Sequence, residues 1–216
     1  MDIGKIDLAK REHSAPIAQL HFEAINQGFL PRLGKPFLQD LYKFLIIKEI
    51  VISYSEDNEI RGFVSCAISS QGIMKRFILH SKRSMFKIGG AILKNPGLIK
   101  PMWETFQAPK RSISTDQDED TIPTTELLSI AVSTKAQNSG IGTLLIQALE
   151  KELKSRNIHR YKVIAGQTLV GANKFYQKNG FKLAKQITIH GKEVSNVYVK
   201  NLKGGGMIMS GITTTA

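Results

Sequence analysis

The sequence predicts a mixed α/β (α+β) domain with a central sheet flanked by helices, and three observations carry this prediction. The chain has 216 residues, 42% of them hydrophobic, which is enough to bury the core of one domain. Two β-branched runs, 50–55 and 60–69, are joined by the polar turn 56–59 and predict an antiparallel hairpin. From residue 125 onward, short apolar runs alternate with amphipathic stretches in the order strand, helix, strand, helix, strand, which is typical of a mixed sheet.

Two helices are expected before this hairpin. The first begins near Ser14, a good N-cap, and has apolar residues at helical spacing. Its residue His21 could face a ligand pocket, although a lone histidine on a helix is more often structural or exposed. The second helix follows the Gly- and Pro-rich stretch 28–36. The apolar residues of these helices are Ile17, Leu20, Ala24 and Ile25 in the first and Phe37, Leu41, Phe44 and Leu45 in the second.

The net charge of +12 is concentrated in one segment. Residues 71–111 contain nine Lys or Arg and one acid, Glu104, so that this segment alone carries nine minus one, or +8. Its apolar residues are interleaved with the bases and interrupted at Asn95-Pro96-Gly97, which predicts one or two basic amphipathic helices. A basic excess favours a phosphorylated ligand, nucleic acid or an anionic membrane surface, but a solvated helix face explains it equally well. The acidic stretch 116–120 is expected to be a mobile loop.

The second half of the chain divides into clear elements. Gly140 opens a helix whose apolar positions form one stripe, and Asn179-Gly180 is expected to stop the next helix. The last two strands are expected to meet at a turn containing Gly191. The tail 203–216 has no packing signal and is expected to be flexible, which leaves 1–202 as a single domain. The expected strands are 127–132, 161–165, 181–189 and 193–201, and the expected helices start at residues 140 and 171.

Composition argues against several classes of protein. No apolar run reaches the roughly 18–20 residues of a membrane span, and residues 1–10 lack the apolar centre of a secretory signal. Cys66 is the single cysteine, which rules out an intramolecular disulfide, and its place in an apolar run favours core packing. These features favour a cytoplasmic protein without a metal. No metal-ligand spacing connects His13, His80 and His159.

The segment with the clearest chemistry is Gln137-Asn138-Ser139-Gly140-Ile141-Gly142, between a buried strand and an amphipathic helix. A loop in this position points successive backbone amides outward, and the helix N-terminus adds a partial positive charge. Glycine lets a phosphate approach the backbone because it has no Cβ. The segment therefore predicts an anion site suited to a pyrophosphate. Glycines at this spacing are a weak signal by themselves, and they do not say which phosphorylated ligand binds.

In this context the segment resembles motif A of the GNAT superfamily, which is a strand, the pattern Gln/Arg-x-x-Gly-x-Gly/Ala, and a helix. Here the strand is 127–132 and the pattern is 137–142. A second motif of the superfamily, with an Asn, an aromatic-Tyr pair and a Gly-Phe ending, is matched by 172–181, 35 residues further on (137 to 172). The resemblance covers 125–202. It implies a GNAT-type, mostly antiparallel sheet and acetyl-CoA as cosubstrate. In such a sheet the basic helical segment 71–111 is expected to be an insertion between the third and fourth strands.

The resemblance also implies the residues of the acetyl-CoA site. Backbone groups of Ile130 and Val132 would pair with the pantetheine arm, and Gln137 with the amides of 139–143 would hold the pyrophosphate. Asn173 would help to fix the pantetheine arm or its surroundings. The full expected set is Ile130, Ala131, Val132, Gln137, Asn138, Ser139, Gly140, Ile141, Gly142, Thr143, Asn173, Phe175, Tyr176 and Lys178.

Two residues are candidates for the acetyl-transfer chemistry. Tyr176 matches the tyrosine that commonly protonates the departing coenzyme A thiolate, and a phenol with a pKa near ~10 can supply that proton. The alternative is a plain core aromatic. Glu126 stands eleven residues before Gln137, the offset of the catalytic Glu in histone-type acetyltransferases, and would deprotonate the amine. The alternatives are a solvated strand-end carboxylate or a water chain; strand 161–165 offers no other acid.

On this interpretation the acceptor is a primary amine that attacks the thioester directly. The stretch 28–38 resembles GNAT members of bacterial surface-sugar pathways, which together with the basic insertion favours an amino-sugar nucleotide. A protein N-terminus or lysine is the main alternative, and polyamines and aminoglycosides are disfavoured by the net charge. A coenzyme A-binding module that docks on an anionic membrane through 71–111, or one without turnover, stays open. No nucleic-acid-binding module is recognisable, and both monomer and homodimer are compatible with the sequence.

Overall fold

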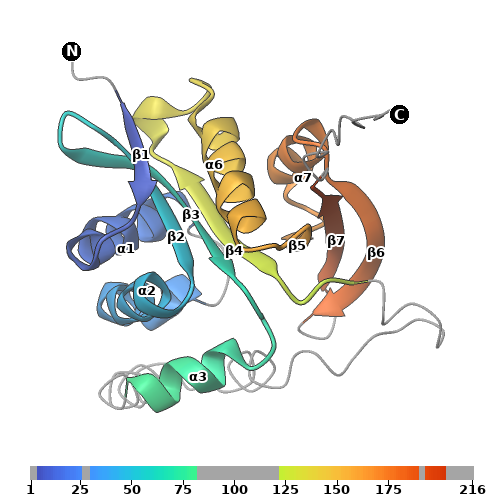
Figure 1. Ribbon diagram of the computed structural model, residues 1–216, viewed down its shortest axis with the longest axis horizontal. Coiled ribbons are helices and arrows are strands. Elements are labelled where there is room, and N and C mark those ends of the chain that lie inside the picture. The colour runs from blue at the N-terminus through green and yellow to red at the C-terminus, as the bar shows by residue number, and fades with distance from the viewer. Residues whose placement is uncertain (1–3, 26–29, 82–121, 190–192, 203–216) are drawn as a thin grey trace, which may run out of the picture.

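One seven-stranded sheet organises the molecule (Figure 1). The computed structural model describes residues 4–25, 30–81, 122–189 and 193–202. The strands lie in the order β1-β2-β3-β4-β5-β7-β6, in which β4 and β5 are parallel and every other neighbouring pair is antiparallel. The predicted fold class, a mixed and mostly antiparallel sheet flanked by helices, is confirmed.

The element bounds follow the predicted order closely. The strands are β1 (Lys5–Leu8), β2 (Ile50–Glu56), β3 (Glu59–Ala67), β4 (Glu126–Val132), β5 (Arg160–Gly166), β6 (Lys182–Ile189) and β7 (Glu193–Asn201). The helices are α1 (Ser14–Ala24), α2 (Lys35–Lys48), α3 (Ile73–His80), α6 (Ile141–Ser155) and α7 (Val170–Lys178). Short 3₁₀ segments are η1 (Arg11–His13), η2 (Leu30–Leu33) and η5 (Thr134–Ala136).

β1 is an element that the sequence did not predict. It is four residues long and pairs antiparallel with β2, from Lys5 opposite Ser55 to Leu8 opposite Ile52. Three of its four side chains are exposed, so that the segment has no alternation of buried and exposed positions for a pattern to reveal. It forms because β2 would otherwise present a row of unpaired backbone groups at the edge of the sheet.

α1 begins at Ser14 as expected, but the prediction that Ser14 is its N-cap is wrong. η1 runs directly into α1, so that His13 occupies the N-cap position with helical angles, φ −72° and ψ −8°. An N-cap residue needs non-helical angles for its side chain to reach the first free amides. The chain here is already helical when it arrives, and Ser14 is instead a buried first residue of the helix.

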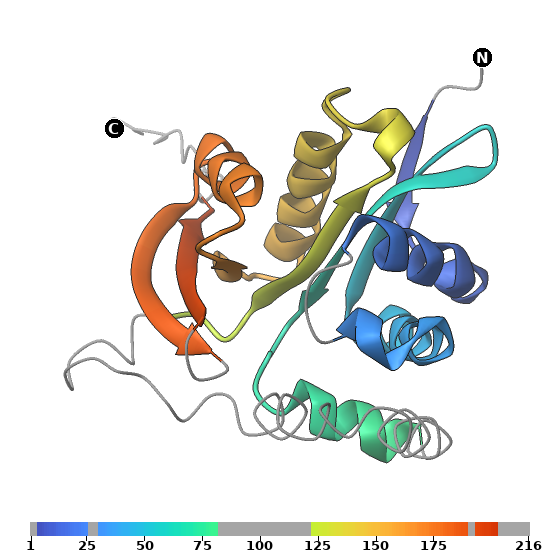
Figure 2. The ribbon, with the colours of Figure 1, turned by 180° about the vertical axis from the view of Figure 1, so that it is seen from behind.

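Helices cover both faces of the sheet and bury a separate apolar core on each (Figures 1 and 2). α6 and α7 lie on one face; α1, α2 and α3 lie on the other. Leu145 and Leu149 of the predicted apolar stripe on α6 are completely buried. Gly62 of β3 permits this close packing, because a Cβ there would lie 3.1 Å from both Ile141 Cγ2 and Leu145 Cδ1.

The first part of the predicted basic insertion is a helix. α3 packs on α2 through Phe77, whose ring contacts those of Phe37 and Phe44. Arg76 ties α3 to the end of α2, because its guanidinium donates to Glu49 Oε1 at 2.9 Å. The insertion follows β3 and precedes β4, as expected.

Several expectations fall on parts of the chain that lie outside the described residues. These are the rest of the insertion (82–111), the acidic loop 116–120, the turn at Gly191 and the tail 203–216. Within the described ranges, no helix has the length and apolar character needed to cross a bilayer. Cys66 is completely buried, as predicted for a core position.

Candidate active site

A gap between β4 and β5 is the central feature of the candidate site. The two strands are paired at Glu126–Lys162 and Leu127–Val163, and Lys162 also donates its amide to the Thr125 carbonyl at 2.9 Å. Beyond Leu127 the pairing ends, and the strands separate as they run toward α6 (Figure 1). The opposite edge of β4 stays paired with β3 from Glu126 to Val132, apart from one bulged residue. β4 therefore has one satisfied edge and one open edge.

A bulge accompanies the separation. Ser65 of β3 lies opposite Ser129, but the next residue, Cys66, lies opposite Leu127, so that Leu128 is an extra residue in β4. A bulge of this kind bends the strand and re-aims its side chains. It falls at the point where β4 leaves β5.

The backbone groups of Ile130 and Val132 point into the gap. The Ser133 amide donates to the Arg61 carbonyl, on the β3 side, at 2.8 Å. Because successive residues of a strand direct their backbone groups to opposite edges, Val132 and Ile130 direct theirs toward β5. These are the two residues expected to pair with the pantetheine arm, and the geometry leaves their edge open for such a partner.

The loop before α6 forms a cluster of outward-pointing amides at one end of this gap. Asn138 and Gly140 have positive φ angles of 64° and 86°. Within the described residues, no hydrogen bond from the amides of 138–143 to a protein acceptor is present. The start of α6 adds its partial positive charge to them. The Gln137 side chain donates to the Val132 carbonyl at 3.4 Å and so joins the loop to the open edge of β4.

The two glycines of this loop have different roles. A Cβ on Gly140 would meet nothing within 4 Å, so that the space beside it is free for a ligand. A Cβ on Gly142 would lie 3.1 Å from Phe175 Cε2 and 3.2 Å from Cζ, so that Gly142 is needed for the contact between α6 and α7. The prediction that glycine admits phosphate to the backbone therefore suits Gly140, whereas Gly142 serves helix packing.

Tyr176 is held rigidly on α7. Its ring packs among Phe175, Phe181 and Tyr198 at centroid distances of 5.5, 5.5 and 6.3 Å. Burial raises the pKa of Tyr176 to about 12, because the phenolate would be poorly solvated. In the described part of the chain its hydroxyl has no hydrogen-bond partner. Tyr176 is therefore a protonated phenol with a free donor, as the expected acid role requires.

Asn173 is engaged entirely within the protein. Its amide nitrogen donates to the carbonyls of Gly166 at 2.9 Å and Leu169 at 2.8 Å. Its oxygen accepts from Asn196 Nδ2 at 2.8 Å and from the Tyr198 hydroxyl at 3.0 Å. This side chain fastens the first turn of α7 to β5 and β7. It orders the surroundings of the gap, and direct contact with the pantetheine arm stays a prediction.

Glu126 lies at the closed end of the gap. Its carboxylate is 3.5 Å from Lys162 Nζ, and both side chains are largely buried. Burial raises the pKa of Glu126, and the opposing influence of Lys162 and Ser70 is smaller. A carboxyl group with a raised pKa is a better base than an exposed one, which suits the expected role. Glu126 lies where β4 and β5 are still paired, so it is not on the open edge that contains Ile130 and Val132.

Ala131 and Lys178 are two further residues of the expected acetyl-CoA site. Ala131 turns its methyl group into the core under α1 and α2, so that only its backbone could serve a ligand. Lys178 is exposed on the last turn of α7. Within the described ranges, no group of three or more His, Cys, Asp or Glu side chains could hold a metal ion.

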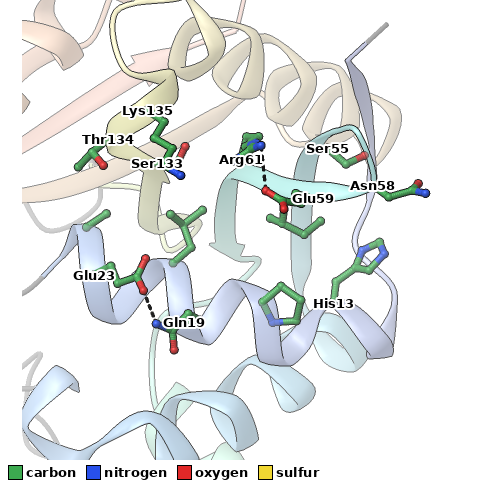
Figure 3. Close-up of a pocket in the computed structure, with 14 residues that line it drawn as sticks. His13, Gln19, Glu23, Ser55, Asn58, Glu59, Arg61, Ser133, Thr134 and Lys135 are labelled. Carbon is green, nitrogen blue, oxygen red and sulfur yellow. Dashed lines mark hydrogen bonds and ion pairs between the residues drawn. The ribbon is translucent and has the colours of Figure 1, made fainter. Parts of the chain in front are cut away.

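A groove of about 530 Å³ opens on the α1 face of the sheet, beside the end of β4 (Figure 3). Glu23 of α1 lies across it from Thr134 and Lys135, which follow β4. Arg61 on its upper wall pairs with Glu59 at 2.8 Å. The groove offers charges of both signs to a polar ligand.

Sequence reasoning missed a second polar feature, a hydrogen-bonded chain through His21, Tyr42, Ser129 and Ser65 under α1 and α2. Ser129 gave a signal, since it is a polar residue inside the apolar run 127–132. Tyr42 gave none, because a tyrosine on the apolar stripe of a helix is ordinary.

Comparison with known proteins agrees with this geometry. The model of the Acetyltransferase (GNAT) family matches residues 101–181. The uncharacterized proteins YdhI and YxbD of Bacillus subtilis (strain 168) are 38% identical over 55 residues and 37% identical over 54 residues. These matches cover 26% and 25% of this chain, and the chain spans about a third, 34%, of the length of each relative.

Solved structures share the whole fold. The ribosomal-protein-S18-alanine N-acetyltransferase of Escherichia coli superposes with a TM-score of 0.57 at 12% identity, over 96% of this chain and 99% of that one. The protein yncA of Salmonella typhimurium, solved with its cofactor acetyl-CoA, gives a TM-score of 0.57 at 12% identity, over 93% and 94%. The fold, with its separated strands and amide-lined helix start, is therefore that of GNAT acetyltransferases, and residues 101–181 are similar to the Acetyltransferase (GNAT) family.

Proposed function

We propose that this protein is an N-acetyltransferase that moves an acetyl group from acetyl-CoA to a primary amine. The observation that carries the proposal is the open edge of β4 beside the free amides at the start of α6; the protonated phenol of Tyr176 on α7 adds a candidate acid. The residues present fit the cosubstrate: a pyrophosphate needs amide donors, and a pantetheine arm needs a strand edge with which to pair.

The chain's own groups divide the work of the reaction. Acetyl-CoA would supply a thioester carbon for attack by the amine nitrogen; the C–N bond forms first, and the C–S bond breaks when the tetrahedral intermediate collapses. Backbone amides on the open edge of β4, near Val132, stabilise the oxyanion of the tetrahedral intermediate. Tyr176 donates its proton to the sulfur that leaves, and Glu126, directly or through water, takes the proton that the amine loses.

The amine acceptor that we propose first is an amino-sugar nucleotide. The supporting features are the basic segment that begins at α3 and the mixed charges of the groove between α1 and the end of β4. Arg61 and Lys135 in that groove suit the phosphate oxygens of such an acceptor. The second choice of acceptor is a protein N-terminus or a lysine side chain, which would use the same groove.

The cellular setting follows from the same features. We propose a cytoplasmic enzyme, because acetyl-CoA is a cytoplasmic metabolite and Cys66 is a buried free thiol. A competing proposal is a coenzyme A-binding module that docks on an anionic membrane through 71–111, since α3 combines bases with the exposed Leu79. Sedimentation with anionic and neutral vesicles separates these proposals: binding to anionic vesicles without amine turnover favours the module.

The first experiment is thermal unfolding with and without acetyl-CoA. A ligand at ~100 times its dissociation constant adds ~2.7 kcal/mol, or roughly 5–10 °C in a domain of this size. Gly140→Ala should reduce the shift, because its Cβ projects into the space beside the free amides. Gly72→Ala is the matched control: Gly72 also precedes a helix with positive φ, 64°, and with nothing within 4 Å, but it lies at α3.

Turnover is measured as thiol release with UDP-glucosamine, a peptide with a free N-terminus, and spermidine as acceptors. Tyr176→Phe should keep the thermal shift and lose ~100-fold or more in turnover, the usual size of a general-acid contribution. A wild-type protein that shows no shift with millimolar acetyl-CoA would overturn the proposed function. Equal loss of the shift in Gly72→Ala and Gly140→Ala would show that backbone strain, not the ligand site, is responsible.

A further inference from the structure

A chain of four buried polar groups crosses the α1 and α2 face of the sheet and ends at the bulge of β4. His21 Nδ1 lies 2.6 Å from the Tyr42 hydroxyl, which lies 3.0 Å from Ser129 Oγ. Ser129 Oγ lies 2.7 Å from Ser65 Oγ. The four residues come from α1, α2, β4 and β3, so that the chain exists only in the folded protein.

The surroundings of this chain are otherwise apolar. His21, Tyr42 and Ser65 are 3%, 1% and 0% exposed, and the ring of His21 stacks on Phe63. Buried polar groups are costly unless each has a partner, and apolar residues of similar size would fill the same space without that requirement. Packing alone therefore does not explain why four linked polar groups occupy this core.

The hydrogen bonds of the chain have a preferred direction. Burial lowers the pKa of His21 to about 4, and no charged side chain of the described residues counteracts it, so that the imidazole is neutral. Burial also raises the pKa of Tyr42, which keeps its proton. A phenol O–H donates more strongly than a neutral imidazole N–H. Tyr42 therefore donates to His21 Nδ1, and its oxygen accepts the proton of Ser129.

Ser129 is the place where this chain meets the candidate site. It is half-buried, whereas the other three members are buried. It lies at the bulge, two residues beyond Leu127, the last residue of β4 that pairs with β5. With its own proton given to Tyr42, and one lone pair available to Ser65, Ser129 Oγ has a lone pair left to accept a hydrogen bond.

We propose that Ser129 Oγ receives an N–H of the acceptor amine at the β4 bulge, and that Tyr42 and His21 are positioning residues that keep this oxygen an acceptor. The inference rests on the acetyl transfer proposed above. An amine held by its N–H keeps its nitrogen lone pair free to point at the thioester carbon. Glu126, which is paired with Lys162 at the closed end of the gap, is left to take the proton afterwards.

The direction of the chain is tested first by nitrogen-15 NMR of the His21 ring in the full-length protein at pH 7. The proposal expects an unprotonated Nδ1 and a protonated Nε2, and the Nδ1 signal should move in Tyr42→Phe. A proton on Nδ1 would make Tyr42 the acceptor from His21 and the donor to Ser129, which would free the Ser129 proton to point at the amine and overturn the proposal. This measurement needs no knowledge of the acceptor.

The proposed role of Ser129 in binding the acceptor is tested by steady-state kinetics, with an amine that gives thiol release as the acceptor. Ser129→Ala and Tyr42→Phe should raise KM for the amine or lower kcat/KM ~10-fold or more, with KM for acetyl-CoA unchanged. His21→Asn, whose amide oxygen can replace Nδ1 as acceptor, should retain more activity than His21→Leu. Ser53→Ala is the control, because Ser53 is a buried serine of the neighbouring strand β2 outside the chain.

The outcomes separate the two proposals. Wild-type kinetics in Ser129→Ala, or equal losses in His21→Asn and His21→Leu, would overturn the positioning role while acetyl transfer stands. Absence of an acetyl-CoA thermal shift in the wild type would instead overturn the proposed function.

Discussion

Truncation of Asn173 should destabilise the protein before any ligand is added. In Asn173→Ala the buried Asn196 Nδ2 and Tyr198 hydroxyl lose their acceptor, whereas the carbonyls of Gly166 and Leu169 keep the backbone amides of Leu169 and Asn173 as donors. A buried polar group left without a partner costs about 1–3 kcal/mol, and the groups here are neighbours whose losses do not add fully. We expect a loss of about 3 kcal/mol.

The assay is urea and thermal unfolding of the ligand-free protein. A loss of about 3 kcal/mol corresponds to a decrease in Tm of roughly 6–12 °C for a chain of this size. Asn179→Ala is the matched control at the C-terminal end of the same helix: its side chain makes one hydrogen bond, to the Phe175 carbonyl at 2.8 Å, so that a loss of about 1 kcal/mol is expected.

The alternative is that Asn173 chiefly serves the pantetheine arm. In that case Asn173→Ala would unfold within about 1 kcal/mol of the wild type and would bind acetyl-CoA more weakly. That result would refute the structural role derived from the hydrogen bonds to Asn196 and Tyr198.

Two further predictions concern pH. Because burial lowers the pKa of His21 from 6.5 to about 4, the unfolded chain binds the proton more tightly, and the free energy of unfolding should fall by about 3 kcal/mol between pH 7 and pH 4 through this group. His21→Asn should flatten that part of the curve in urea titrations; parallel curves would contradict the prediction. For Glu126 the sign is opposite, because its pKa is higher in the folded than in the unfolded chain. The resulting contribution to the free energy of unfolding is fully present below the unfolded pKa of 4.5 and is lost as the pH rises through the folded pKa. The free energy of unfolding of Glu126→Gln minus that of the wild type should therefore increase from pH 4 to pH 8, and a constant difference would show that Glu126 has an ordinary pKa.

The sequence predicted the elements that depend on local pattern. The apolar stripe of α6, the β-branched runs of β2 and β3 with the polar turn between them, and the glycine at position 140 each have a direct physical signature in neighbouring residues. β1 escaped prediction because an edge strand with mostly exposed side chains has no such signature. The N-cap of α1 was misplaced because the 3₁₀ segment before it changes the backbone angles that a cap requires.

For the candidate site, the sequence by itself determined the residue types and their order: the loop before α6, Tyr176 on α7 and Glu126 at the start of β4. Only the tertiary structure decided where β4 leaves β5, because a single extra residue at Leu128 sets that point and no local pattern marks it. Tertiary structure alone also joined His21, Tyr42, Ser129 and Ser65, since hydrogen bonds between residues as far as 87 positions apart depend on how helices pack on a sheet. Local preferences are encoded by neighbours in the chain, whereas a site is made by neighbours in space.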